Sequence, residues 1–344
     1  MTASFATCGE RELPEHPLTA TVGFIANPHA GKDIRRLVAH ASPTSDVAKM
    51  GIMRRAALGA VAGGATRLVV APDGHRLAER AVDDLGVEVR VDLLDEPVTG
   101  TSDDTIAMAG RMAKEDAGAV IVLGGDGTSR DVAKGWLDVT LMPVSTGTNN
   151  VFPRLVEGTV AGLAAGLVAS GAVPRAHATY QADVIHVSFD DGSDDELALV
   201  DVALVDGHFI GARAVWDMRE LREVVACIAE PSNVGLSALA AQLHPVHRHE
   251  PGGVHVRLGQ GRSVTAALAP GMFVAAGVQS SRLLADGESV QFTGPGVMAF
   301  DGERDRVLAS GVTATLTIRR DGPHVIEVDR TLTAAARAHH FERS

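Results

Sequence analysis

The residues with the clearest chemical potential form a glycine-rich group: Gly124, Gly125, Asp126, Gly127 and Thr128. Glycines let the backbone turn sharply and bring its N–H groups within hydrogen-bonding distance of phosphate oxygens. Asp126 supplies a carboxylate for a Mg²⁺ ion carried by ATP or for a hydroxyl nucleophile. The group predicts a phosphate-binding loop. The alternative is a strand-to-helix turn in which Gly and Asp only satisfy backbone geometry.

Two other phosphate-binding loops are excluded by the residues nearby. A dinucleotide fingerprint needs a third glycine where this chain has Arg130, and Gly31, Lys32 and Asp33 lack the upstream glycine and the Ser or Thr of a P-loop. Neither a Rossmann dehydrogenase nor a P-loop ATPase fits the sequence.

The elements that must position the glycine group form an alternating series in the first half of the chain. Apolar runs predict strands at 21–26, 67–71, 87–91, 119–123 and 140–144, with helices after the first strand and from about residues 75, 102 and 129. This alternation is typical of βαβ units and predicts a mostly parallel sheet with helices on its faces. Ligands bind such sheets at the carboxyl ends of the strands, which is where the glycine group lies.

Two pairs of residues have the spacing of a capping box, Thr101 with Asp104 and Thr128 with Asp131. They predict helix starts at these positions. Asn149 or Asn150 could likewise serve as a helix cap within a simple turn.

The chain changes character after Pro153. A helix expected over 159–170 ends at Gly171, and from residue 177 short strand-like runs separated by Gly, Asp and Pro predict a β-rich unit. Helices are expected near 214–229 and 232–242, with Pro231 between them. The predicted organisation is therefore α/β: an N-terminal α/β nucleotide-binding domain at 20–155, a C-terminal β-rich, sandwich-like substrate domain at 156–330, and a C-terminal helix within 331–344.

Composition limits the classes of function. The chain has 344 residues, 45% hydrophobic and 22% charged, which fits a folded protein of two domains. A net charge of -12 argues against a nucleic-acid groove. No apolar stretch predicts membrane insertion, and two cysteines without an export signal favour the cytoplasm.

Three further segments join the glycine group in a recognisable order. Gly124 to Thr128 resembles the GGDGT signature of NAD, diacylglycerol and sphingosine kinases. The other similar segments are Asn27, Pro28 and Gly31, like the NPxxG turn; Gly147, Thr148, Asn149 and Asn150, like the GTxND segment; and Asp301, Gly302 and Glu303, like the DGE signature. The first two are implied to line the nucleotide site, and the acidic residues of the third to approach the phosphates and the acceptor hydroxyl.

The longer stretches NPHAGKDIRRL, LGGDGTSRDVAKGW, PVSTGTNNVFP and FDGER resemble the ATP-NAD kinase-like proteins of acetoin catabolism, the AcoX group. The resemblance implies a kinase domain, a sandwich-like domain and an ATP site in the cleft between them. It also implies a homo-oligomer. Asp201 lies nearest to the position of the dinucleotide-binding pair in NAD kinases, so it is the candidate for substrate binding.

These observations predict an ATP- and Mg²⁺-dependent kinase that phosphorylates a hydroxyl group. Asp126 is the candidate for catalytic base and for contact with the metal, and Asp301 and Glu303 act from the opposite wall. NAD is one candidate acceptor. The alternatives are a lipid or polyol kinase of the diacylglycerol kinase type, or an accessory protein that binds ATP or NAD without turnover.

Two polar clusters outside these motifs are interpreted as solvated loops. His244, His247, His249 and His255 lack cysteines and helical spacing, so no metal site is assigned to segment 244–255. Acidic residues in segment 190–196 lack the ligand pattern of a Ca²⁺ loop and predict a hairpin tip.

Overall fold

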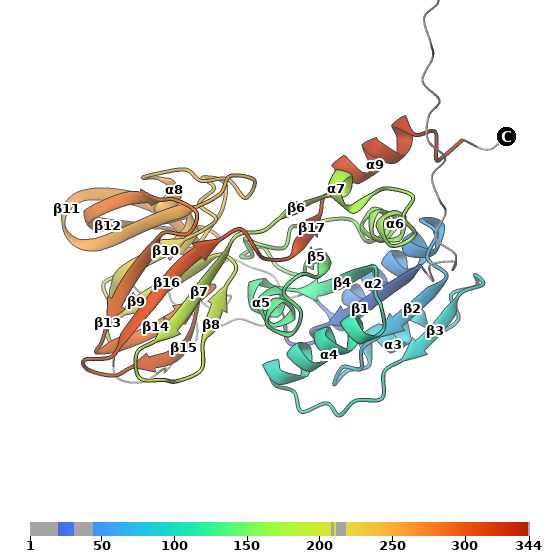
Figure 1. The fold of residues 1–344 in the computed structure, drawn as a ribbon, viewed down its shortest axis with the longest axis horizontal. Helices are drawn as coiled ribbons and strands as arrows, with labels where there is room; N and C mark the ends of the chain where they lie inside the picture. Colours follow the sequence, from blue (N-terminus) through green and yellow to red (C-terminus); the bar gives the residue numbers. More distant parts are fainter. Residues whose placement is uncertain (1–19, 31–43, 208–209, 211–217, 343–344) are drawn as a thin grey trace, which may run out of the picture.

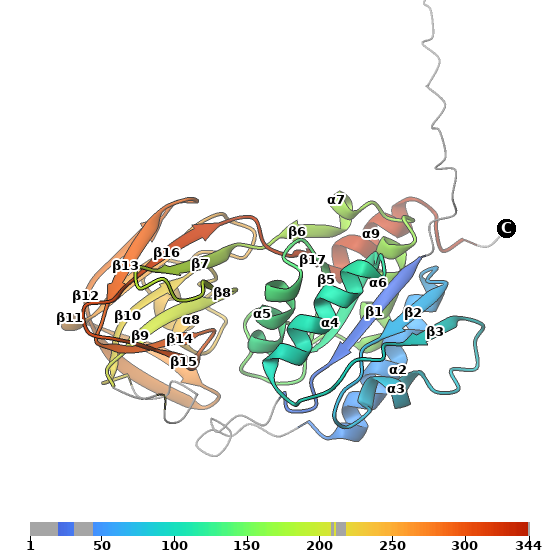
Figure 2. The ribbon, with the colours of Figure 1, turned by 60° about the horizontal axis from the view of Figure 1, so that its bottom comes forward.

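The computed structural model describes residues 20–30, 44–207, 210 and 218–342. An α/β part and a β-rich part lie next to each other, and helix α5 is on the side of the α/β part that faces the β-rich part (Figures 1 and 2). The predicted fold class is confirmed, because one sheet is mostly parallel and the other two are antiparallel.

The α/β part is built on a seven-stranded sheet with the order β3-β2-β1-β4-β5-β17-β6. Strands β1 to β5 are parallel, β17 is parallel to β5, and β6 is antiparallel to β17. The strands are β1 (Thr21–Ala26), β2 (Arg67–Val70), β3 (Arg90–Leu93), β4 (Ala119–Gly124), β5 (Thr140–Ser145), β6 (Thr179–Gln181) and β17 (His324–Ile326). The helices are α2 (Asp46–Ala62), α3 (Leu77–Val82), α4 (Ser102–Lys114), α5 (Asp126–Gly135), α6 (Gly158–Ala169), α7 (Arg175–Ala178) and α9 (Val328–Arg337).

Strand β4 is buried along its whole length, as its apolar run predicts. Val120 and Val122 belong to the same apolar cluster as residues of α4 and α5, whereas Ile121 and Leu123 belong to the cluster with α2, α3 and α6. Alternate side chains of a strand point to opposite faces, so helices cover both faces of the sheet. The carboxyl end of β4 therefore opens at the edge of the sheet, next to the start of α5.

Helices α2 and α6 pack closely because glycines line their contact. A Cβ atom on Gly162 would lie 1.9 Å from the carbonyl oxygen of Ala56 in α2. The helix predicted over 159–170 is confirmed by α6, most of whose residues are buried. Among the described residues, no helix combines the length and the apolar character that a bilayer crossing requires.

We expect Gly162→Ala to lower the free energy of unfolding by about 1–3 kcal/mol, because the two helix backbones must move apart. Gly51, in α2, is the matched control, since a Cβ there has only the Arg55 guanidinium nearby, at 3.4 Å. Gly51→Ala should raise stability by about 0.5–1 kcal/mol through helix propensity. Urea unfolding measures both changes. Equal shifts of the two variants would contradict the close approach of α2 and α6.

The β-rich part contains a six-stranded sheet, order β12-β11-β10-β9-β14-β15, and a four-stranded sheet, order β13-β16-β7-β8. Apolar residues from both sheets, among them Val187, Leu204, Phe292 and Leu316, share one core, which is the arrangement of a sandwich. The elements are β7 (Val184–Phe189), β8 (Glu196–Ala198), β9 (Asp201–Val205), β10 (Leu221–Ala226), α8 (Leu236–Ala241), β11 (Gly253–Ala269), β12 (Met272–Leu284), β13 (Ser289–Thr293), β14 (Gly296–Phe300), β15 (Glu303–Leu308) and β16 (Thr313–Arg319).

The helix predicted near 214–229 is wrong over its described residues. Leu221–Ala226 forms β10, which pairs with both β9 and β11, so its apolar residues are buried by sheet pairing. Residues 214–217 of this prediction lie outside the described residues. The helix predicted for 232–242 forms only as α8, which begins at Leu236 after Gly235 with a φ of +100°.

Several elements that the sequence places after the α/β domain are part of it: β6 and β17 belong to its sheet, and α6 and α9 are among its helices. Helix α6 and strand β6 precede the sandwich, and β17 and α9 return the chain to the same sheet after it. The tail helix begins at Val328, earlier than expected, and packs against α6 and α7, with Thr331 and Ala335 buried. The chain therefore crosses between the two parts twice.

Candidate functional site

The glycine group lies at the junction of β4 and α5. Gly124 ends β4, Gly125 is the N-cap, and α5 begins at Asp126. The helix start predicted near Ser129, with Thr128 as its cap, is therefore wrong, because residues 126–128 already form the first turn. The first-turn N–H groups of a helix have no partner within the helix and favour anions. They lie where the sequence predicts phosphate binding.

Close packing explains the first two glycines. A Cβ on Gly124 would lie 2.5 Å from the Cβ of Thr128, and a Cβ on Gly125 would lie 2.8 Å from Oδ1 of Asn150. A side chain at either position would push these neighbours away. The glycines thus join the helix start to the segment that follows β5.

Asn27 links the first strand to the glycine group. Its Nδ2 donates to Oγ1 of Thr128 at 2.9 Å, and its Oδ1 accepts from the N–H groups of His29 and Ala30 at 2.8 and 3.2 Å. Fully buried Lys49, from α2, donates to the carbonyl oxygen of Pro28 at 2.7 Å. The turn after β1 is therefore held from two sides. Gly31 of the predicted motif lies outside the described residues.

Asp126 contacts the segment after β5 through its carboxylate. Oδ1 accepts from the N–H groups of Val151 and Phe152 at 3.0 and 2.8 Å, and Oδ2 accepts from Val151 at 3.1 Å. The same segment is closed by Ser145, whose Oγ accepts from Nδ2 of Asn150 at 2.7 Å and from the N–H of Gly147 at 3.2 Å. The backbone amides of Val151 and Phe152 thus help to orient the Asp126 carboxylate.

The predicted acidic pair Asp301 and Glu303 comes from the turn between β14 and β15. Asp301 is buried, has a φ of +51°, and accepts hydrogen bonds from the N–H groups of Leu199 and Val200 at 3.0 and 2.8 Å. Burial raises the pKa of Asp301 to about 6, against the opposing charge of Arg130 and the amide hydrogen bonds. Glu303 faces the helix start, since a Cβ on Gly127 would lie 3.9 Å from its Oε2.

A cavity of 580 Å³ lies between these segments. Twelve of the predicted site residues line it: Asn27, Pro28, Gly125, Asp126, Gly127, Thr128, Gly147, Thr148, Asn149, Asn150, Asp301 and Glu303. Gly124 does not line it and acts through packing. Asp201 does not line it either; it is buried in β9, and its carbonyl oxygen accepts from the N–H of Asp301 at 2.8 Å.

Residues that the sequence motifs do not mark as site residues also line the cavity. They are chiefly Asp73, Gly74, Thr101, Ser102, Asp104, Arg130, Asp131, Arg304 and Asp305. Asp73 and Gly74 follow β2, and Thr101 and Asp104 follow β3, so the rule that ligands bind at the carboxyl ends of parallel strands could have found them. Asp73 accepts from the N–H groups of Leu77 and Ala78 at 3.0 and 3.1 Å and so caps α3.

The predicted capping box at Thr101 forms only in part. Thr101 is the N-cap of α4, but its side chain makes no capping bond. Asp104 instead accepts from the N–H of Thr99 at 3.0 Å and of Gly100 at 2.7 Å, and these bonds lower its pKa although burial opposes them. The loop before α4 is thereby fixed along the cavity.

Arg130 and Asp131 connect α5 to the β14–β15 turn. The guanidinium of Arg130 donates to the carbonyl oxygen of Phe300 at 3.1 Å and to Asp305 at 3.3 Å. Burial raises the pKa of Asp131 to about 7, and the charges of Glu303 and Asp305 act in the same direction against those of Arg130 and Lys134. Burial thus raises the pKa of two carboxyl groups that line the cavity, Asp131 and Asp301.

Carboxylates outnumber guanidinium groups around the cavity, so a polyphosphate would need a counter-ion there. Within the described ranges, no group of three His, Cys, Asp or Glu side chains is arranged to hold a metal ion. The carboxylates that line the cavity, such as Asp126 and Glu303, fit a different kind of site. In such a site the phosphates of the nucleotide hold most of the Mg²⁺ ion, and one or two carboxylates complete its coordination.

The histidines of segment 244–255 have separate partners. His244 pairs with Ser281 at 3.0 Å, His249 with Glu327 at 3.3 Å, and His255 with Glu223 at 2.9 Å. His255 lies in β11 and not in the predicted loop. The segment therefore joins several elements.

Comparisons with known proteins agree with this geometry. Residues 22–172 match the ATP-NAD kinase N-terminal domain family, and residues 183–321 match the acetoin catabolism protein X C-terminal domain family. The chain is 36% identical over 343 residues to acetoin catabolism protein X of Cupriavidus necator, and the match covers 95% of each sequence. The crystal structure of yeast NADH kinase complexed with NADH has a similar fold, with a TM-score of 0.51 and 13% identity over 96% of this chain and 90% of that chain.

Proposed function

Because the chain belongs to the acetoin catabolism protein X family and carries an NAD kinase-type N-terminal domain, we propose that it is an ATP-dependent kinase acting on a hydroxyl group, with NAD as the first candidate acceptor. The observation that carries the proposal is the convergence of four separate motifs on one cavity at the start of α5. We further propose that the protein works as a cytoplasmic homo-oligomer.

The residues of the cavity have distinct roles in the proposed reaction. The N–H groups of residues 125–128 bind phosphate oxygens, where the helix dipole also favours negative charge. The acceptor oxygen forms a bond to the γ-phosphorus as the bond from that phosphorus to the ADP oxygen breaks, and the hydroxyl proton passes to the carboxylate of Asp126. The amides of Val151 and Phe152 hold that carboxylate in place.

Magnesium, when bound with the nucleotide, neutralises the charge of the phosphates, and Asp126 is the side chain that would contact it. Glu303 faces the helix start from the β-rich part and would orient the acceptor. Asp301 acts less directly, because its carboxylate holds the backbone of residues 199–201 and so fixes the turn that carries Glu303.

The lining of the cavity favours a polar acceptor. Among the described residues that line it, most are polar, charged or glycine, and the apolar minority includes Ile25 and Met108. A lipid acceptor would need a predominantly apolar site. We therefore rank a dinucleotide or a small polyol above diacylglycerol and sphingoid bases.

The proposal is tested by incubating the purified protein with ATP and Mg²⁺ and one acceptor at a time: NAD, NADH, glycerol, diacylglycerol or sphingosine. We expect ADP release coupled to a phosphorylated dinucleotide or polyol, identified by ³¹P NMR. Transfer to lipid alone would support the lipid kinase alternative. Tight ATP binding by calorimetry without transfer to any acceptor would instead support the accessory-protein alternative and contradict the proposal.

A further inference from the structure

The peptide group between Val151 and Phe152 is bonded on both of its sides to charged side chains. Its N–H donates to Oδ1 of Asp126 at 2.8 Å, and its carbonyl oxygen accepts from Nη2 of Arg248 at 3.0 Å. Nη1 of Arg248 also donates to the carbonyl oxygen of Phe152 at 3.1 Å. A cation and an anion thus bind opposite ends of one amide dipole, and hydrogen bonds in such a chain strengthen one another.

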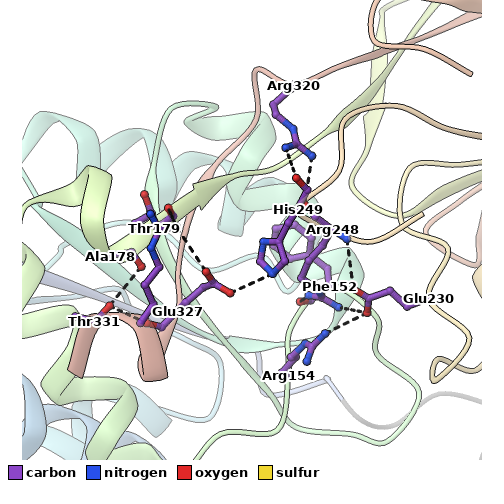
Figure 3. A network of polar contacts seen from close by, with 11 residues as sticks. Phe152, Arg154, Ala178, Thr179, Glu230, Arg248, His249, Arg320, Glu327 and Thr331 are labelled. Atoms are coloured by element: carbon purple, nitrogen blue, oxygen red, sulfur yellow. Dashed lines mark hydrogen bonds and ion pairs between the residues drawn. The ribbon is translucent and has the colours of Figure 1, made fainter. Parts of the chain in front are cut away.

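Glu230 in turn fixes Arg248 through two hydrogen bonds from the guanidinium, one from Nε and one from Nη2 (Figure 3). Nε donates to Oε1 of Glu230 at 3.0 Å, and Nη2 donates to Oε2 at 2.9 Å. Both side chains are about 95% buried, being 5% and 6% exposed. Arg154 reaches the same Oε2 from the α/β part at 3.1 Å. A bidentate pair of this kind holds a guanidinium in one orientation.

The interactions with Arg248 favour the ionised form of Glu230. Burial acts to raise its pKa, but the hydrogen bonds and charge of Arg248 outweigh burial and lower the pKa of Glu230 to about 2. The same interactions raise the pKa of Arg248, although burial opposes them. The charged forms of both side chains are therefore favoured, and Arg248 donates to the carbonyl oxygens of residues 151 and 152.

The connection runs between the two parts of the molecule. Glu230 precedes α8 and Arg248 follows it, both within the β-rich part, whereas residues 151 and 152 follow β5 in the α/β part. Arg320 also contacts this pair, because it donates to the carbonyl oxygen of Arg248 at 3.4 Å. Arg320 is itself paired with Asp183 at 2.9 Å. Buried ion pairs are weak sources of stability. Their geometry here suits a role in orientation.

We propose that Arg248 and Glu230 are positioning residues which fix the peptide of residues 151 and 152 and thereby aim the Asp126 carboxylate into the cavity. The inference rests on the proposed function, because it assigns the pair to the step that Asp126 performs. Neither residue lines the cavity. They should therefore influence turnover and leave nucleotide binding almost unchanged.

Arg248→Lys and Glu230→Gln test the proposal. Lysine keeps the charge, but three donors on a single nitrogen cannot replace the four hydrogen bonds that Arg248 makes from Nε, Nη1 and Nη2. Glutamine keeps the shape of Glu230 but removes the charge that holds Arg248. We expect each variant to lower kcat at least about 10-fold, with the Kd for MgATP within about 3-fold of the unchanged protein. Arg257→Met is the matched control. Arg257 also pairs with a buried glutamate, Glu223 at 3.2 Å, but it is 56% exposed and lies on β11.

A second measurement, the ¹H–¹⁵N signal of Phe152 by NMR, needs no catalysis. Both variants should move this amide proton upfield, as should Asp126→Asn, while Arg257→Met leaves it in place. A shifted signal with unchanged kcat, a lowered kcat with an unshifted signal, or parallel losses of kcat and MgATP binding would overturn the proposal. If the wild-type protein transfers no phosphate at all, the proposed function fails, and the Phe152 signal alone decides whether Arg248 and Asp126 are coupled.

Discussion

Asp126→Asn is expected to lower the rate of phosphoryl transfer by about 10²- to 10⁴-fold, because the variant lacks the carboxylate that accepts the hydroxyl proton. Stability should also fall, by about 1–3 kcal/mol. The Oδ2 atom of Asp126 accepts a hydrogen bond from the Val151 N–H, and the Nδ2 group that replaces it in asparagine cannot accept one. Steady-state kinetics with ATP, Mg²⁺ and the best acceptor measure the first effect. Urea unfolding measures the second.

Asp73→Asn separates the two effects. Asp73 also lines the cavity and also accepts hydrogen bonds from backbone amides, those of His75, Leu77 and Ala78. Its replacement should cost similar stability but keep turnover within about 10-fold of the unchanged protein, because it does not touch the reacting atoms. If both variants lost activity equally, general damage to the cavity would explain the result and Asp126 would have no special role.

Asp131→Asn is expected to stabilise the protein at pH 8 and to have a much smaller effect at pH 4. Burial raises the folded-state pKa of Asp131 from 3.8 to about 7. Between these values the folded state binds the proton more tightly, so the wild-type protein loses stability as pH rises through this window. About three pKa units correspond to a limit of about 4 kcal/mol, which asparagine should recover.

Thermal or urea unfolding at the two pH values measures the difference. Asp206→Asn serves as a control on an exposed carboxylate, which is 67% exposed, and should differ by less than about 0.5 kcal/mol between pH 4 and pH 8. A pH-independent effect of Asp131→Asn, or destabilisation at pH 8, would mean that Asp131 is not held in a poorly solvated position. A carboxyl group that costs stability and lines a cavity is characteristic of functional sites.

The sheet and the convergence of the motifs could be predicted because both follow from local patterns. The apolar run of β4 and its flanking glycines identify a buried parallel strand, and the carboxyl edge of such a sheet brings Asn27, Asp126 and Asn150 together whatever the loop lengths. The glycine group was placed correctly, but its helix begins at Asp126. The sequence does not show this start, because Thr128 and Asp131 have the spacing of a capping box. Both residues in fact lie within α5, whose N-cap is Gly125.

Contacts between distant segments could not be predicted in the same way. β10 was expected to be helical because its apolar content carries no information about β9 and β11, which bury it. Asp201 matches the family pattern only by position, and it is buried in β9 and does not line the cavity. Arg248 lies in a segment that resembles a solvated loop, and its importance depends on carbonyl oxygens 96 and 97 residues away.

We propose that the start of α5 binds the phosphates of ATP in the cavity between the two parts. A crystal structure of the protein with a non-hydrolysable ATP analogue, Mg²⁺ and NAD tests it most directly. We predict phosphate oxygens within hydrogen-bonding distance of the N–H groups of residues 125–128 and an acceptor hydroxyl next to Asp126. An analogue bound elsewhere, or a cavity empty at a concentration that saturates binding in solution, would show that the start of α5 is not the phosphate site.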